Sequence, residues 1–229
     1  LSQKSQIFLE KLLSFDNASI SHLNCYFRKL VDSVDSSYSQ YDAVMLAEWL
    51  DWPLVALEKW LFERPNPYEY RTFSIPKKGK HGFREIDAPT LQLKFLQQRV
   101  YHRMLKKLNV HEAATGFVPN KSIINNALPH VGQEVVINID LKDFFSNISS
   151  NRVYKSWRFL GWDVKSAMIL TNICCYRGRL PQGAPTSPAL SNLCNQRLDE
   201  RLQRFLAVEG GQYTRYADDI TLSFPVFDD

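Results

Sequence analysis

The sequence predicts an α+β fold, in which helices and short strands come from different stretches of the chain. Apolar residues recur every three or four positions over much of residues 1–65 and again over residues 91–108, the period of helices that pack one face on a core. Other segments alternate or are continuously apolar over short runs, as strands are. These segments are residues 70–75, 83–88, 135–140 and the closing strand–turn–strand at 212–224.

Changes in these patterns divide the chain into three predicted regions. Residues 1–65 form a helical N-terminal extension, which the proline-containing segment ERPNPYEY brings to an end. Residues 66–134 contain a β-hairpin around the basic turn PKKGKHG and the helix over 91–108. Residues 135–229 contain the apolar strand VVINID, further helices, a Pro/Gly loop and the closing hairpin.

The composition predicts a soluble globular protein. Of the 229 residues, 45% are hydrophobic and 23% are charged, which is enough apolar surface for a sizeable core. No apolar run approaches the roughly 18 residues that a membrane-spanning helix needs, and the first residues lack the pattern of a signal peptide. We therefore expect a cytoplasmic protein with no membrane partner. The four cysteines match no zinc-binding spacing, and the adjacent Cys174 and Cys175 are poor disulfide partners for each other. We therefore expect reduced thiols, as is usual in a cytoplasmic protein, for Cys25, Cys174, Cys175 and Cys194.

The net charge of +4 is unevenly distributed. Residues 1–70 carry 6 basic and 10 acidic side chains, whereas residues 71–121 carry 11 basic and 3 acidic ones, a net charge of +8. Such a block is a candidate surface for a polyanion. A solvated face of the protein is the alternative that charge alone leaves open.

Acidic residues stand where two strands are expected to meet turns. Asp140 ends VVINID, and Asp218 and Asp219 lie in YADD between two strand-like segments. Each occurrence by itself has a structural explanation, because aspartate is common in turns. Together they offer hard oxygen ligands that bind Mg²⁺ while leaving positions for water and phosphate. The pattern therefore predicts metal-assisted phosphoryl chemistry.

Three motifs in a fixed order make this prediction more specific. The strand ending in Asp140, the segment LPQGAPTSP (180–188) and the YADD hairpin follow one another along the chain. In this order they resemble the palm motifs of reverse transcriptases. The resemblance implies a right-hand polymerase palm with a split βαβ-type sheet and helical fingers that carry the basic hairpin. The thumb of the family is absent from the sequence, which ends at Asp229, so we expect this chain to be part of a longer protein.

The resemblance also implies a set of metal ligands. Asp140 and Asp218 would both bind the same pair of Mg²⁺ ions. Mn²⁺ is a possible substitute for Mg²⁺. The carbonyl of Leu141 would bind one ion, and Asp219 is a supporting carboxylate. The three aspartates are thus the predicted catalytic residues.

Further positions match the nucleotide-binding residues of the family. Gln182 and the glycine turn after it would contact the incoming nucleotide. Lys77 and Arg84, seven residues apart, would clamp its triphosphate, with a solvated turn as the alternative. Phe145 falls on the steric-gate position, where its ring would collide with a ribose 2′-hydroxyl, whereas Phe144 is expected in the core.

The segment NALPH (126–130) indicates the type of reverse transcriptase. It resembles the N-A-x-x-H element of retron reverse transcriptases, and the text around it, TGFVPNKSIINNA and CCY, agrees with that type. The resemblance implies that Asn126 and His130 bind RNA. A turn histidine whose hydrogen bonds are satisfied within the protein is the alternative for His130.

These resemblances imply an RNA-directed DNA polymerase that copies part of a structured non-coding RNA into DNA from dNTPs. An effector protein and a role in antiphage defence are implied with it. A group II intron maturase, another bacterial defence reverse transcriptase and a non-catalytic RNA-binding scaffold are the alternatives. The acidic N-terminal region disfavours a maturase, and the three aspartates disfavour a scaffold. Phe145 and the QGAP loop disfavour a DNA-templated polymerase and an RNA replicase.

Overall fold

The structure, a computed structural model, describes residues 40–62, 69–77 and 82–225. All of them belong to one unit, Gln40–Val226. Most of the predicted helical extension, residues 1–39, lies outside the described residues, as does the middle of the basic turn in the hairpin. Within the described ranges, no helix is both long and apolar enough to cross a membrane.

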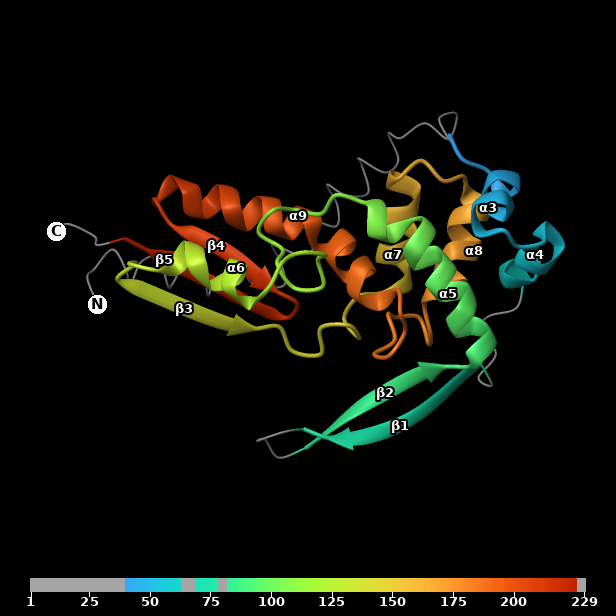
Figure 1. The fold of residues 1–229 in the computed structure, drawn as a ribbon, viewed down its shortest axis with the longest axis horizontal. Helices are drawn as coiled ribbons and strands as arrows, with labels where there is room; N and C mark the ends of the chain where they lie inside the picture. Colours follow the sequence, from blue (N-terminus) through green and yellow to red (C-terminus); the bar gives the residue numbers. More distant parts are fainter. Residues whose placement is uncertain (1–39, 63–68, 78–81, 226–229) are drawn as a thin grey trace. The chain divides into compact units, whose positions relative to one another are not determined.

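Two short helices confirm the helical prediction for the described part of the extension. Helix α3 (Ala43–Leu50) begins after Asp42, whose side chain accepts hydrogen bonds from two amides of the first turn. Helix α4 (Leu54–Phe62) follows Pro53, a residue type common at the start of helices. Both lie at one end of the helical part of the fold (Figure 1).

The predicted β-hairpin is confirmed. Strands β1 (Tyr70–Pro76) and β2 (Phe83–Pro89) form a two-stranded antiparallel sheet of their own. Helix α5 (Leu91–Arg103) follows, and the chain then makes a 3₁₀ turn, η2 (Leu105–Lys107). The helix predicted over residues 91–108 is therefore confirmed as far as Arg103, and its last part tightens into 3₁₀ geometry, as helix ends often do.

The main hydrophobic core lies among the helices. Helices α7 (Ser150–Phe159) and α8 (Val164–Cys174) pack against each other, and α8 also packs against α3, α4 and α5. Their N-caps, Ser149 and Asp163, accept hydrogen bonds from first-turn amides. The core includes these fully buried side chains: Leu46, Leu50, Leu57, Leu93, Val100, Trp157, Ile169, Leu170 and Ile173.

Three of the four cysteines are described, and all three are free thiols: Cys174, Cys175 and Cys194. Cys174 and Cys175 are buried at the end of α8. Burial raises the pKa of Cys174 to about 12, so its thiol stays protonated at neutral pH. None of these three cysteines is paired in a disulfide, and the reduced state of the thiols stays a prediction.

A second sheet has three antiparallel strands in the order β3-β5-β4. Strand β3 (Val135–Asp140) pairs with β5 (Asp219–Phe224), which pairs in turn with β4 (Gln212–Tyr216). The long helix α9 (Ser187–Val208) connects the Pro/Gly loop to β4 and packs against it. Helices connect β3 to β4, and β5 lies between these two strands in the sheet. This is the arrangement of a split βαβ sheet. The predicted α+β fold is confirmed.

A short helix that the sequence analysis did not predict covers part of β4. Helix α6 (Ile123–Ala127) is capped reciprocally by Ser122 and Asn125, and the 3₁₀ turn η3 (Leu128–His130) continues it. Five residues are too few to show a helical period. The predicted region boundaries near residues 65 and 134 stay predictions.

Candidate active site

Strand register brings the three predicted carboxylates to one end of the three-stranded sheet. Asp140, the last residue of β3, lies directly opposite Asp219, the first residue of β5. The amide of Leu141 donates a 2.9 Å hydrogen bond to the carbonyl oxygen of Asp218. Asp218 lies in the two-residue turn between β4 and β5, where Ala217 has a positive φ of 58°. Residues far apart in sequence thus meet at this end of the sheet.

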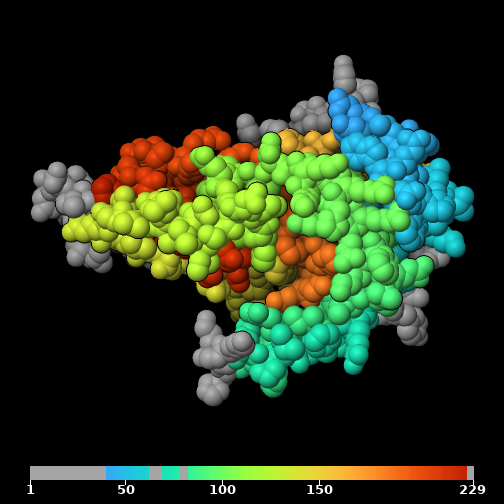
Figure 2. Space-filling view, in the orientation of Figure 1, coloured from blue at the N-terminus to red at the C-terminus, as the bar shows by residue number. Residues whose placement is uncertain are grey.

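The carboxylates are accessible from outside. Asp140 and Asp219 are exposed and Asp218 is half-buried. In Figure 2 the red end of the chain reaches the surface between the yellow-green segment and the orange loop, above the teal hairpin. A charged ligand can therefore approach this site without passing through the core.

The donor set at this end of the sheet fits Mg²⁺. All of the candidate ligands are oxygens, three from carboxylates and one from the Leu141 carbonyl, and Mg²⁺ prefers oxygen. In the described residues no group of three His, Cys, Asp or Glu side chains is close enough to hold an ion by itself. Mg²⁺ in phosphoryl-transfer sites is commonly bound by one or two carboxylates together with substrate phosphates. A site completed by substrate is consistent with this geometry.

A loop to which the sequence analysis assigned no structural role, residues 114–116, supports the turn that carries Asp218. Ala114 forms a parallel bridge with Arg215, and Thr115 donates a 2.8 Å backbone hydrogen bond to the Arg215 carbonyl. The next residue, Gly116, lies so close to the turn that a Cβ on it would be 2.4 Å from the Ala217 nitrogen. Only glycine permits this approach. The Thr-Gly pair was visible in the sequence, but nothing local indicates what the glycine contacts.

The Gln182–Gly183 loop docks on the basic hairpin. The amide of Asp87, in β2, donates a 2.8 Å hydrogen bond to the carbonyl of Gln182. Gly183 has φ +133°, and a Cβ on it would lie 2.8 Å from the Asp87 carbonyl oxygen. The backbone of the loop is therefore held against the hairpin, while the Gln182 side chain stays half-exposed.

Lys77 and Arg84 lie at the far end of the same hairpin, and both are exposed. Arg84 pairs with Ile75, and the Lys77 amide donates to the Gly82 carbonyl at 3.0 Å, continuing the ladder. Because side chains alternate along a strand, Lys77 and Arg84 share one face of the hairpin. The structure thus brings these two predicted triphosphate ligands together.

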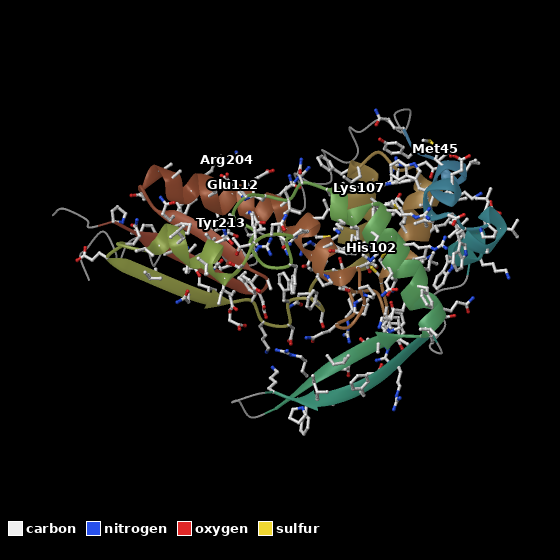
Figure 3. All side chains as sticks on the ribbon, viewed as in Figure 1. Met45, His102, Lys107, Glu112, Arg204 and Tyr213 are labelled. Carbon is white, nitrogen blue, oxygen red and sulfur yellow. The ribbon has the colours of Figure 1, made fainter. Side chains whose placement is uncertain are left out.

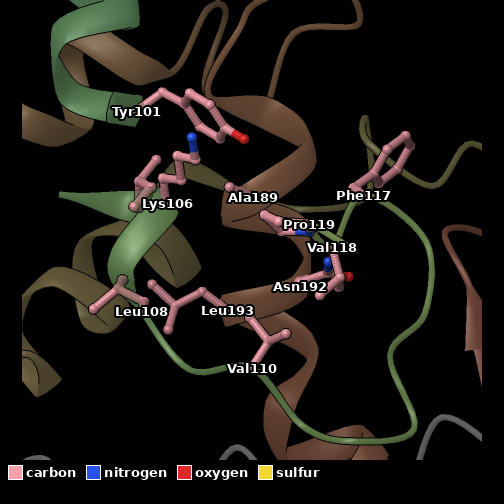
Figure 4. Close-up of a pocket in the computed structure, with 11 residues that line it drawn as sticks. Tyr101, Lys106, Leu108, Val110, Phe117, Val118, Pro119, Ala189, Asn192 and Leu193 are labelled. Carbon is pink, nitrogen blue, oxygen red and sulfur yellow. The ribbon is translucent and has the colours of Figure 1, made fainter. Parts of the chain in front are cut away.

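The two adjacent phenylalanines have different surroundings. Phe144 is buried, which confirms its predicted place in the core. Phe145 is half-buried, and its ring centroid lies 6.0 Å from that of Phe117 and 5.3 Å from that of Phe144. Phe117 also lines a small, mainly apolar pocket between α5, the following loop and α9 (Figure 4). Phe145 is thus held by ring contacts while part of it remains accessible.

His130 is buried against strands β4 and β5. One ring nitrogen, Nδ1, is 2.6 Å from the Ser223 hydroxyl, and the other, Nε2, is 2.8 Å from the Thr214 hydroxyl. Asn126 accepts from the Thr115 hydroxyl at 2.8 Å, and its carbonyl accepts from the hydroxyl of Thr214. The His130 side chain therefore braces the sheet, whereas Asn126 contacts the sheet through its backbone carbonyl. The predicted RNA-binding role of both residues stays a prediction.

We expect this buried histidine to make folding pH-dependent. Burial lowers the pKa of His130 below its ordinary value, so the unfolded chain binds a proton that the folded one excludes. The free energy of unfolding should therefore fall as the pH drops below about 6.5. His130→Gln should flatten this slope and destabilise the fold by roughly 1–3 kcal/mol at pH 7.5, because hydroxyl partners lose their bonds.

Denaturant unfolding at pH 5.5 and 7.5 measures both effects. His102→Gln is the matched control, because His102 is exposed on α5. Identical pH dependence in wild-type protein and His130→Gln would contradict the prediction.

Comparison with known proteins identifies the family. The family model described as reverse transcriptase (RNA-dependent DNA polymerase) matches residues 75–226. The retron Ec86 reverse transcriptase of Escherichia coli is 44% identical over 157 residues, which are 68% of this chain and 49% of that protein. The retron Mx65 reverse transcriptase of Myxococcus xanthus is 41% identical over 178 residues, 70% of this chain and 42% of that protein.

Among solved structures, telomerase from Candida albicans in complex with a fragment of telomeric RNA matches with a TM-score of 0.46 and 14% identity. The match covers 69% of this chain and 38% of that one, and so distant a likeness carries no argument. The chain spans about half the length or less of the two retron relatives. The match of the family model extends over most of the described chain, including both strands that carry the aspartates. The chain therefore belongs to the reverse transcriptase family, and the relatives to which it is similar are retron reverse transcriptases.

Proposed function

We propose that the full-length protein is a retron-type, RNA-directed DNA polymerase that copies part of a structured non-coding RNA into DNA. The observation that carries this proposal is the strand register, which sets Asp140 opposite Asp219 and ties Leu141 to Asp218. That arrangement gathers carboxylates at an accessible sheet end, as nucleotidyl transfer from a dNTP requires. The identity to retron reverse transcriptases supports the retron type.

In this proposal the end of the sheet holds two Mg²⁺ ions. Asp140 and Asp218 would ligate both, the Leu141 carbonyl one, and Asp219 would add negative charge beside them. Bound there, the metal supplies the Lewis acidity that activates a 3′-hydroxyl and neutralises the leaving pyrophosphate. The backbone hydrogen bond between Leu141 and Asp218 ties the segment that carries Asp140 to the turn that carries Asp218.

The incoming nucleotide would lie between the hairpin and the sheet end. Arg84 would bind the triphosphate through its planar guanidinium and Lys77 as a point charge. The Gln182–Gly183 backbone, held by Asp87, would line the nucleotide site. Phe145 would occupy the space that a ribose 2′-hydroxyl needs.

The clamp is tested by Lys77→Ala and Arg84→Ala. Each variant should raise the KM for dNTP by about 10-fold or more, since a charge-assisted bond is worth roughly 1.5–3 kcal/mol. RNA affinity should change much less, because both side chains are assigned to the triphosphate. Steady-state primer extension and RNA binding at one salt concentration measure the two effects. Equal loss of RNA affinity with unchanged KM would instead assign the hairpin to the RNA backbone.

RNA-templated synthesis is the direct test of the proposed function. We expect purified full-length protein to carry one structured RNA, identified by sequencing the nucleic acid that co-purifies with it. We expect it to extend DNA on that RNA with dNTPs and Mg²⁺, and with Mn²⁺ as a substitute. Binding of RNA without nucleotide incorporation under both metals would favour the non-catalytic scaffold.

The remaining parts of the proposal concern partners. Asn126 and His130 belong to the proposed RNA-binding element, and the effector protein, the antiphage role and the cytoplasmic location follow from the retron type. Replacing Asn126 and His130 together by alanine should lower affinity for the co-purifying RNA and spare extension of an unrelated primer–template. Loss of extension with intact RNA binding would assign the two residues to support of the sheet alone.

A further inference from the structure

A fully buried ion pair lies directly behind the turn that carries Asp218. Arg215, in β4, donates from Nε to Asp199 Oδ1 at 2.8 Å and from Nη2 to Asp199 Oδ2 at 2.7 Å. Both side chains have 0% exposure. Neither residue belongs to the motifs assigned above, and burying two charges costs free energy that an apolar pair would not cost. The pair therefore calls for an explanation beyond stability.

The remaining contacts of Arg215 lead to the turn itself. Its Nη1 donates to the carbonyl oxygen of Ala217 at 3.1 Å and to Asn192 Oδ1 at 3.1 Å. Asn192 in turn donates to the carbonyl of Gly116 at 2.9 Å, and Gly116 is the residue whose backbone touches Ala217. One guanidinium thus links the backbone of the turn to helix α9 by a continuous set of hydrogen bonds.

A tyrosine completes the network. Tyr213, which is labelled in Figure 3, donates its hydroxyl to Asp199 Oδ1 at 2.6 Å. Burial, together with the neighbouring Asp199, raises the pKa of Tyr213, so the hydroxyl keeps its proton and remains a donor. Asp199 therefore receives three hydrogen bonds and stays fixed as the partner of Arg215.

The Arg215 network and the carboxylates of Asp140 and Asp219 lie on opposite faces of the sheet. Arg215 pairs with Ile220, and Tyr216 pairs with Asp219. Because neighbouring residues of a strand point to opposite faces, Arg215 projects to the α9 side while Asp219 and the opposite Asp140 project to the other. Arg215 is thus aimed away from the substrate side and reaches the turn through backbone.

We propose that Arg215, held by Asp199 and Asn192, is a positioning residue that fixes the backbone of the Ala217–Asp218 turn and thereby the spacing of the metal-binding carboxylates. This inference rests on the proposed role of Asp218 as a metal ligand. Lysine cannot replace arginine here, because an ammonium on a flexible stem cannot make the paired bonds to Asp199 together with those to Ala217 and Asn192.

The test removes the charges without leaving one of them unpaired. In the full-length protein, Tyr213→Phe, Asp199→Leu and Arg215→Met are combined, since well-packed apolar side chains often replace a buried ion pair without loss of stability. We expect RNA affinity to be unchanged and the protein to remain folded, with a lower melting temperature only to the extent that the Ala217 carbonyl and Asn192 Oδ1 lose their Arg215 donor. We expect the Mg²⁺ concentration for half-maximal DNA synthesis to rise about 10-fold or more. The saturated single-turnover rate should fall about 100-fold, as for a misplaced catalytic group.

Arg215→Lys is the second variant, which keeps the positive charge beside Asp199. Arg215→Lys should show the same shift in Mg²⁺ dependence. If the triple variant fails to fold, Arg215→Lys alone tests the positioning role. Arg204→Met is the control for loss of an arginine, because Arg204 is exposed on α9 (Figure 3). Wild-type Mg²⁺ dependence and rate in the folded triple variant, or in Arg215→Lys if the triple variant is unfolded, would overturn the inference.

Asp218→Asn, assayed in parallel, separates this inference from the proposed function. Synthesis that survives Asp218→Asn overturns the metal assignment itself. Synthesis that is lost in Asp218→Asn but intact in the Arg215 variants overturns the positioning role alone.

Discussion

Asp218→Asn is expected to abolish DNA synthesis by the full-length protein while leaving its RNA affinity nearly unchanged. The amide keeps the shape of the side chain but removes the charge that we propose holds Mg²⁺. A bound metal ion contributes several kcal/mol of transition-state stabilisation, so the rate should fall by roughly 10³-fold or more. Single-turnover incorporation of a dNTP on an RNA template, measured beside RNA binding, tests both parts of the expectation.

Asp143→Asn is the matched control for this change. Asp143 is exposed, lies a few residues after Asp140 and has a positive φ of 51°, which asparagine also adopts readily. The variant loses the same charge close to the same site, and it should retain synthesis. Wild-type rates in Asp218→Asn would show that the end of the sheet is not the metal site.

Phe145→Ala is expected to admit ribonucleotides. Its ring is proposed to exclude the 2′-hydroxyl by steric collision, and such discrimination depends on a built-in clash rather than on a lost bond. Removing the clash should lower the ratio of kcat/KM for dNTP to kcat/KM for rNTP by about 10–200-fold, the range of discrimination that one small group provides in a tight pocket. Primer extension with matched dNTP and rNTP measures the ratio.

Phe144→Ala separates selectivity from packing. Phe144 is buried beside Phe145, so its loss should destabilise the fold by roughly 3–5 kcal/mol and leave the dNTP preference intact. An unchanged ratio of kcat/KM for dNTP to that for rNTP in Phe145→Ala would show that Phe145 contributes to packing and not to selectivity.

Local pattern was sufficient for most of the fold. The hairpin at β1–β2, the strand ending in Asp140 and the closing strands around YADD were predicted at their observed places. Their side-chain periodicity is written directly in the sequence, and each strand is bounded by turn residues. The order of the motifs then indicated the site before any distance was known. The short helix α6 was missed, because so few residues carry no period.

The tertiary structure decided which groups meet. No local pattern places Asp140 opposite Asp219, because register depends on how two faces pack across the sheet. The burial of His130 and the contact of Gly116 with the turn likewise depend on segments distant in sequence.

The buried pair of Arg215 and Asp199 is the clearest contact that local sequence patterns do not predict. Alternation along β4 places Tyr213 and Arg215 on one face, but it does not show that this face is buried. Only the packing of α9 on that face supplies the carboxylate that makes burial of the charge tolerable. The sequence by itself therefore determined the strands and most of the helices and predicted the chemistry, whereas the tertiary structure determined which groups support the predicted site. Periodicity is a local property, and the pairing of buried charges is a property of the packed chain.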